Sequence, residues 1–154
     1  MSQTSSITVF LSGSRSIQKL HPLVQQRIWN IMDKNFGVVI GDADGADTAF
    51  QDFLWDNRYP HVVVCCPGTK CRNNLGDWPQ NHIQVPDHIR GREFYTLRDK
   101  AMAASANYGF VVWDGLSKGS LANIKEMKRL GKKSLVFYSQ NHSFQVFSSG
   151  TSAS

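Results

Sequence analysis

Five short runs rich in β-branched and aromatic residues alternate with segments of helical periodicity, and this alternation restricts the fold more than any other feature. The runs cover residues 7–13, 37–41, 61–66, 108–115 and 134–139. Most are continuously apolar, as expected for parallel strands that helices cover on both faces. We therefore predict an α/β fold: a three-layer α/β/α Rossmann-like sandwich around a five-stranded, mostly parallel sheet.

The helical segments fall between these runs. Apolar spacing predicts helices over residues 20–32, 46–54, 92–106 and 120–130, the last ended by Gly131. In the third helix, Arg98 falls inside the apolar arc. A core-facing arginine needs a partner, so Arg98 either pairs with a carboxylate or awaits a ligand phosphate. The candidate carboxylates are Asp42, Asp44 and Asp114.

The chain of 154 residues fits one domain, predicted over residues 1–140, followed by a mostly disordered, serine-rich tail over residues 141–154. Residues 67–90 contain three prolines and are predicted to form a long loop, whose role the sequence leaves open. No apolar stretch is long enough to cross a bilayer, and no signal-peptide pattern begins the chain. We expect a cytoplasmic protein without membrane partners, and a homo-oligomer is left open.

Neither the cysteines nor the acidic loop predicts a metal site. Cys65, Cys66 and Cys71 lack paired C-x2-C spacing, and the first two are interpreted as small apolar strand residues without a disulfide. The loop "GDADGAD" has the aspartate spacing of a calcium loop, but Phe53 stands where the bidentate glutamate is needed. We expect no metal and no cofactor.

The formal net charge of +5 makes an anionic partner plausible. Most basic residues are scattered, apart from a cluster over residues 125–133. This cluster is either the solvated C-terminal end of a helix or a surface for nucleic acid.

Ligands of open α/β sheets bind beyond the carboxyl ends of the strands, so the loops at that edge carry the candidate site. Glycines allow close approach of a ligand, hydroxyl groups and a helix N-terminus bind phosphate, and carboxylates accept ribose or base hydrogen bonds. Plain turns and helix caps are the alternative for each loop. The candidate ligand-binding residues are Ser12, Gly13, Ser14, Arg15, Gly41, Asp42, Asp44, Gly45, Asp47, Arg98, Trp113, Asp114, Gly115, Ser117, Gly119 and Ser120.

These motifs, in this order, resemble the SLOG (SMF/DprA-LOG) superfamily, in particular its YspA-like branch of small Rossmann-like nucleotide-binding proteins. The resemblance rests on "GSRS", "GDADGAD" and the segment 98–133 with "RDKAM" and "WDGLSKGS". It implies the strand order 3-2-1-4-5 and a ligand at the carboxyl edge. Phosphoribohydrolases of the superfamily carry PGG-x-GT-x-x-E, but here Leu121, Ala122 and Asn123 follow Ser120, and no glutamate stands at that place.

Three functions follow as hypotheses. The first is binding of a nucleoside phosphate, ADP-ribose or NAD-like ligand by a sensor, carrier or sequestering protein. The second is cleavage or transfer at a nucleotide N-glycosidic bond, with Asp114 and Arg98 as tentative catalytic residues because Asp114 is expected on the pocket floor. The third is nucleic-acid binding through the basic helix over residues 125–133.

Overall fold

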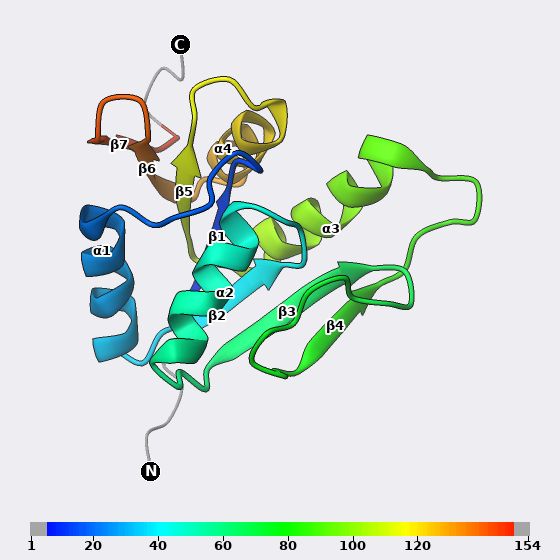
Figure 1. Cartoon of the computed structure of the whole chain (residues 1–154). Coiled ribbons are helices and arrows are strands. Elements are labelled where there is room, and N and C mark those ends of the chain that lie inside the picture. Colours follow the sequence, from blue (N-terminus) through cyan, green and yellow to red (C-terminus); the bar gives the residue numbers. More distant parts are fainter. Residues whose placement is uncertain (1–5, 150–154) are drawn as a thin grey trace.

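Each of the five predicted strands forms part of one sheet in the computed structural model, which describes residues 6–149. They are β1 (Thr8–Gly13), β2 (Gly37–Gly41), β3 (Val62–Pro67), β5 (Tyr108–Trp113) and β6 (Lys133–Tyr138). All run parallel in the order β3-β2-β1-β5-β6 (Figure 1), which matches the order 3-2-1-4-5. The α/β class with a parallel-dominated sheet is therefore confirmed.

The prediction of five strands is wrong, because two more strands lie at the edges. β4 (Gln80–Ile83) pairs parallel with β3, and β7 (Ser143–Phe147) pairs antiparallel with β6. Both are mostly solvent-exposed, so neither shows the apolar pattern of a covered strand. β7 falls within residues 141–154, which were predicted to form a mostly disordered tail, so residues 143–147 form an ordered edge strand of that segment; residues 150–154 lie outside the described residues.

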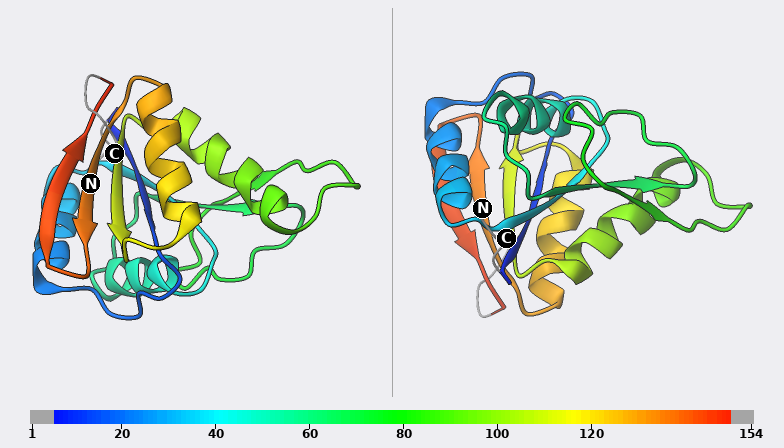
Figure 2. Two further views of the ribbon diagram at one scale, coloured as in Figure 1. Left: turned by 90° about the horizontal axis from the view of Figure 1, so that it is seen from above. Right: turned by 90° about the horizontal axis from the view of Figure 1, so that it is seen from below.

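Two helices cover each face of the sheet, as Figure 2 shows. α1 (Pro22–Asp33) and α2 (Ala46–Asp56) pack on one face, and α3 (Gly91–Ser105) and α4 (Lys118–Arg129) pack on the other. Alternation along β1 distributes its side chains between the layers, because Leu11 joins the α1/α2 core whereas Phe10 joins the α3/α4 core. Ser12 has the parity of Phe10 and therefore faces the α3/α4 layer.

The long loop over residues 67–90 is fastened to the domain. Trp78 is buried, its Nε1 donates to the Tyr59 carbonyl at 2.8 Å, and its ring meets Trp55 edge-on. Farther along the same loop, β4 joins β3 and α3 in the part of the fold that projects from the remaining elements in Figure 1. Trp78 thus anchors the loop to the core.

Cys66 and Cys71 form a disulfide at the end of β3, with their Cα atoms 5.1 Å apart. The expectation that no disulfide forms is therefore wrong. The short return of the chain after β3 brings the two residues together, which spacing alone does not show. Cys65 is a free, buried strand residue, as predicted.

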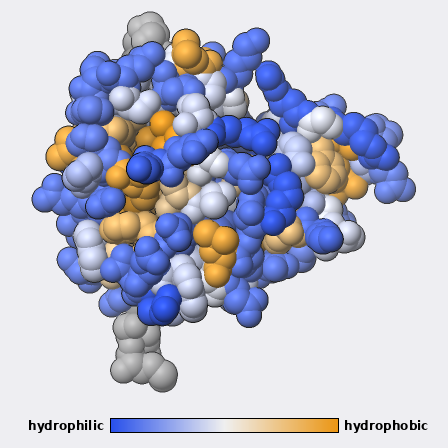
Figure 3. Space-filling view, viewed as in Figure 1, coloured by the Kyte–Doolittle hydropathy of each residue, from blue (hydrophilic) through white to orange (hydrophobic). Residues whose placement is uncertain are grey.

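The surface view in Figure 3 is mostly hydrophilic, with scattered apolar patches. Along the part of the chain that the structure describes, no helix combines the length and apolar character needed to cross a membrane.

Candidate functional site

A cleft of about 730 Å³ opens at the carboxyl edge of the sheet, between α3, α4 and the loops after β1, β2 and β5. Ten of the predicted ligand-binding residues line it: Ser12, Gly13, Ser14, Arg15, Asp47, Arg98, Asp114, Ser117, Gly119 and Ser120. Six others do not line it: Gly41, Asp42, Asp44, Gly45, Trp113 and Gly115. The second group supports the cleft or lies outside it.

Serine hydroxyls from two loops meet at the inner end of the cleft. Ser14 is buried, and its Oγ lies 2.9 Å from the Ser117 Oγ and 3.3 Å from the Ser120 Oγ. The same Oγ accepts a hydrogen bond from the Asp114 amide at 3.0 Å. We call Ser12, Ser14, Ser117, Gly119 and Ser120 the hydroxyl cradle. It connects the loops after β1 and β5 with the start of α4.

Ser12 is the cradle residue with an unused polar group. Its side chain is buried, and its Oγ has no hydrogen-bond partner among residues 6–149. A buried hydroxyl without a partner costs about 1–3 kcal/mol relative to a satisfied one. Because Ser12 lines the cleft, a bound ligand could supply the missing partner.

The N-terminus of α4 is also uncapped. Ser117 is the N-cap residue, but its side chain accepts no capping hydrogen bond. The first backbone bond of the helix runs from the Leu121 amide to the Ser117 carbonyl at 3.4 Å. The amides of Gly119 and Ser120 donate to no acceptor in the described chain. Such free amides, with the helix dipole, favour an anion at this position.

Asp114 holds the loop after β5 in shape. Its Oδ1 accepts from the amides of Leu116 and Ser117, both at 2.8 Å, and its Oδ2 accepts from the Ser16 hydroxyl at 2.8 Å. Burial acts to raise the pKa of Asp114, but these hydrogen bonds outweigh it, and the pKa lies below its ordinary value. Both oxygens serve the loop, so the arrangement favours a structural anchor over a proton donor at pH 7.

Two predicted glycines, Gly41 at the end of β2 and Gly45 in the loop after it, are required by close contacts. A Cβ on Gly41 would lie 2.7 Å from the Asp47 Oδ2 and 3.0 Å from the Arg98 Cζ. Gly45 has φ of 85°, and a Cβ there would collide with the Arg15 backbone. Both glycines therefore serve the packing of protein groups. Neither lines the cleft.

Arg98 is buried and pairs with a carboxylate, as one of the two alternatives predicted. Its Nη1 donates to the Asp42 Oδ1 at 2.7 Å, and both side chains are almost fully buried. Arg72 approaches Asp42 from the loop after β3, through its amide at 2.8 Å and its Nη2 at 3.1 Å. Burial acts to raise the pKa of Asp42, but Arg72 and then Arg98 outweigh it and hold the pKa below its ordinary value. Asp42 is thus occupied by protein partners.

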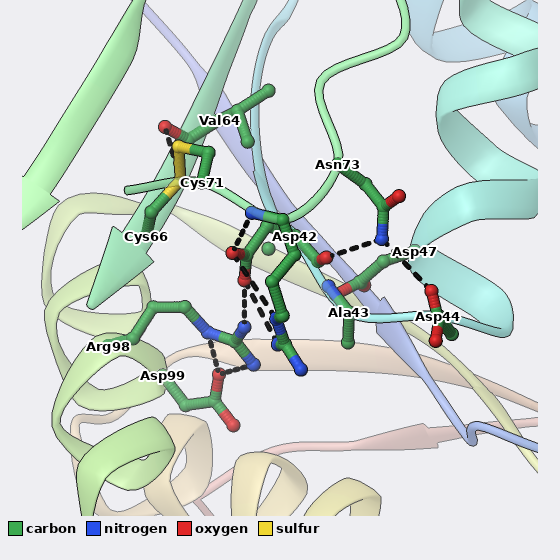
Figure 4. A network of polar contacts seen from close by, with 12 residues as sticks. Asp42, Ala43, Asp44, Asp47, Val64, Cys66, Cys71, Asn73, Arg98 and Asp99 are labelled. Carbon is green, nitrogen blue, oxygen red and sulfur yellow. Dashed lines mark hydrogen bonds and ion pairs between the residues drawn. A yellow bond between two sulfur atoms is a disulfide. The ribbon is translucent and has the colours of Figure 1, made fainter. Parts of the chain in front are cut away.

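Asp99 and Asp47 complete the network around Arg98, part of which Figure 4 shows. The Asp99 Oδ1 accepts a hydrogen bond from Arg98 Nε and forms an ion pair with Arg98 Nη2, each at 3.0 Å. Asp47 lies beside Arg98, and its Oδ2 accepts from the Ala43 amide at 3.2 Å. Asp42, Asp47 and Asp99 face only two guanidinium groups, those of Arg72 and Arg98. One negative charge is therefore in excess.

Two of these three aspartates, Asp47 and Asp99, bind a proton more tightly than an ordinary aspartate. Burial raises the pKa of Asp47 to about 7, even though Arg98 acts in the opposite direction. Burial also raises the pKa of Asp99, against Arg98 and the Asn123 side chain. The predicted site residue Asp44 has an exposed side chain that approaches Arg15 at 4.0 Å. It is linked to the network through Asn73, whose Nδ2 donates to the Asp44 Oδ1 at 3.1 Å and to the Asp42 carbonyl at 2.8 Å.

Asp47→Asn is expected to stabilise the protein at alkaline pH. The folded state holds the Asp47 proton more tightly than the unfolded chain, whose aspartates titrate near 4, so the free energy of unfolding falls as pH rises from about 4 to about 7. Asparagine does not ionise, and the variant should exceed the wild type by about 2–4 kcal/mol at pH 8 and match it near pH 4. Urea unfolding across this range measures the difference. The exposed control Asp44→Asn should show no such pH-dependent gain, and a gain of equal size in the control would contradict the assignment.

Sequence reasoning did not select Asp99, Asn123 or Arg72 as site residues. Asp99 and Asn123 line the cleft, and Arg72 closes over Asp42. Asp99 directly follows Arg98, and Asn123 stands one helical turn after Ser120. The sequence therefore already placed both residues next to predicted site residues. Within the described residues, no group of three or more histidine, cysteine or acidic side chains could hold a metal ion.

No protein-family model matches the sequence, and no curated protein matches it. Among solved structures, DNA processing protein A from Helicobacter pylori, which binds single-stranded DNA, is similar. The superposition has a TM-score of 0.67 at 17% sequence identity and covers 90% of this chain and 68% of that chain. At this identity the likeness concerns the fold. The chain therefore has a Rossmann-like fold similar to that of DNA processing protein A, and its membership of the SMF/DprA-LOG superfamily and of the YspA-like branch stays a prediction.

Proposed function

We propose that the cleft binds a nucleotide or nucleotide-derived ligand, with a phosphate group seated in the hydroxyl cradle. The observation that carries this proposal is the buried, unpartnered Ser12 hydroxyl in the same cleft as the uncapped N-terminus of α4. A phosphate oxygen accepts from hydroxyls and backbone amides alike, so one group would satisfy both. The protein would then act as a sensor, carrier or sequestering protein.

Charge at the mouth of the cleft supports an anionic ligand. Arg92, Lys100 and Lys118 line the cleft and form no ion pair with any residue of the described chain. Arg98 does not belong to this set, because its guanidinium is shared between Asp42 and Asp99. The phosphate is therefore assigned to the cradle, and Arg98 is assigned to the floor beneath it.

Ser12→Ala tests the proposal against a matched control. Ser12 and Ser134 each bury a hydroxyl without a partner among the described residues, but only Ser12 lines this cleft. Removal of either hydroxyl is expected to leave the fold as stable or slightly more stable. Only Ser12→Ala should weaken phosphate binding, by about fivefold to tenfold.

The measurement is isothermal titration with inorganic phosphate, AMP, ADP-ribose and NAD, supported by amide chemical shifts of Gly119 and Ser120. Shifts confined to the start of α4 and an affinity lowered by Ser12→Ala alone are the expected results. Absence of binding by all four compounds to the folded protein would refute the proposal.

Single-stranded nucleic acid is a second candidate ligand, favoured by the structural likeness to a protein that binds single-stranded DNA. In the basic segment, Arg129 pairs with Glu126, and Lys132 donates to the last carbonyls of α3. Lys125, Lys128 and Lys133 are left for phosphate contacts. Binding to an oligonucleotide that weakens steeply with salt, and weakens further in Lys125→Ala and Lys128→Ala, would support this function.

N-glycosidic cleavage is not part of the proposal, since Asp114 is bound by its own loop. The cytoplasmic location and a homo-oligomeric state stay predictions.

A further inference from the structure

The floor of the cleft points to a second recognition element beside the hydroxyl cradle. We infer that the carboxylates of Asp99 and Asp47 accept hydrogen bonds from sugar hydroxyls, so that the cleft selects a ribose phosphate over its deoxy analogues. This inference rests on the proposed seat of the phosphate and specifies the class of ligand. It is argued from the four acidic residues that line the cleft: Asp47, Asp99, Asp114 and Glu126.

Two of the four are committed to protein partners. Asp114 uses both oxygens to hold the loop after β5. Glu126 accepts from Arg129 through both oxygens, at 2.8 Å each. Neither has a free acceptor directed at a ligand.

Asp99 and Asp47 keep acceptor capacity that their protein partners do not use up. Arg98 contacts Asp99 only at Oδ1, through a hydrogen bond from Nε and an ion-pair contact from Nη2, and the Asn123 side chain adds one further hydrogen bond to Asp99. The amide of Ala43 reaches only the Oδ2 of Asp47. The Asp99 side chain is 19% exposed, and both residues line the cleft. Arg98 and the Ala43 amide thus hold the two carboxylates in place. The cleft has a rigid, acceptor-rich floor.

The chemistry of this floor restricts what can approach it. Three carboxylates against two guanidinium groups disfavour a second anionic group, and no metal cluster forms among the described acids. Neutral donors are favoured, and the neutral donors of a phosphorylated metabolite are its hydroxyl groups.

The spacing assigns these donors to the sugar. Asn123 lies three residues after Ser120 in α4, so the Cβ atoms of Ser120 and Asn123 are about 5–6 Å apart. The Asn123 side chain in turn contacts Asp99. Asp99 is therefore separated from Ser120 of the cradle by about one helical turn plus the length of the Asn123 side chain. In a nucleoside 5′-phosphate the ribose hydroxyls are closer to the phosphate than the donors of the base, so the ribose fits this distance.

The test compares AMP with 2′-deoxy-AMP and 3′-deoxy-AMP by isothermal titration, with inorganic phosphate as the probe of the cradle alone. We expect at least one deoxy analogue to bind about tenfold or more weakly than AMP, because hydrogen bonds to charged groups are the stronger ones. Asp99→Asn should lower the affinity for AMP by a similar factor and leave that analogue nearly unchanged. The matched control Glu126→Gln removes a carboxylate from the same cleft and should change neither.

The outcomes separate the two proposals. If inorganic phosphate and AMP bind but both deoxy analogues bind within twofold of AMP, the sugar assignment is wrong while the phosphate cradle stands. An equal loss for all three nucleotides in Asp99→Asn would also overturn it, because that pattern indicates a purely structural carboxylate. If none of the four compounds binds, the cradle fails and the sugar assignment fails with it. The affinities of AMP and its deoxy analogues are compared on the wild-type protein, so this part of the test remains valid if Asp99→Asn does not fold.

Discussion

Replacement of Arg98 by methionine is expected to lower the free energy of unfolding by about 3–5 kcal/mol at pH 7. The Arg98 side chain is only 7% exposed and donates to Asp42 and Asp99. Methionine fills a similar volume but supplies no charge, so Asp42 would keep Arg72 as its guanidinium partner while Asp99 would lose the guanidinium that it contacts. Urea unfolding followed by circular dichroism measures the loss.

The pH dependence of this loss identifies its cause. Without Arg98 the buried carboxylates can avoid the cost of burial by taking up protons, so the deficit should be smaller at pH 5 than at pH 8. Arg129→Met is the matched control, because Arg129 forms a two-bond pair with Glu126 but is 67% exposed. Its removal should cost far less than the removal of Arg98, because water screens an exposed ion pair. Equal losses in the two variants would contradict the central role of the buried network.

The position of Arg98 shows how far helical periodicity carries a prediction. A period of 3.6 residues places Arg98 in the apolar arc of α3, and that placement alone required a partner. The structure confirms a carboxylate partner, but the sequence offered Asp42, Asp44 and Asp114 as equals. Among these three carboxylates, Asp42 is the partner of Arg98. The loop after β3 passes beside the end of β2 and brings Arg72 to the same carboxylate. The path of this loop is a tertiary feature, and no local pattern encodes it.

The edges of the sheet were harder to predict than its centre. Buried strands such as β2 are continuously apolar and stand out in the sequence. β4 and β7 are held by backbone pairing along one side and leave most side chains in water. Backbone hydrogen bonds carry no residue preference strong enough to mark such strands. For the same reason, the disulfide between Cys66 and Cys71 became visible only with the path of the loop.

The loop "WDGLSKGS" contains both kinds of outcome. A glycine and a hydroxyl residue at the start of the fourth helix were predicted, and both line the cleft. Asp114, predicted as the strongest catalytic acid, instead accepts three hydrogen bonds within the loops. An aspartate followed by Gly115 at φ of 79° is typical of a tight turn, so this role was also readable from the sequence.

Gly119→Asp is expected to weaken phosphate binding by about a hundredfold while leaving the fold intact. A Cβ on Gly119 would meet no atom within 4 Å, and its φ is not in the left-handed region, so the protein itself does not require glycine here. An aspartate in the first turn of α4 should even stabilise the helix, by about 0.3–1 kcal/mol. The same charge about 5 Å from a bound phosphate, at an effective dielectric constant of about 20, costs about 3 kcal/mol, or roughly a hundredfold in Kd.

Gly119→Asn separates charge from shape at this position. Asparagine matches aspartate in size, so any steric obstruction of the cradle should appear in both variants, whereas electrostatic repulsion should appear only in Gly119→Asp. We expect the aspartate variant to bind inorganic phosphate and AMP at least tenfold more weakly than the asparagine variant, with equal or higher melting temperature. Retained phosphate affinity in a folded Gly119→Asp protein would place the anion away from α4. Gly119 lines the cleft, and neither its backbone conformation nor its packing requires glycine. Phosphate binding is thus the role proposed for this glycine, and that result would remove it.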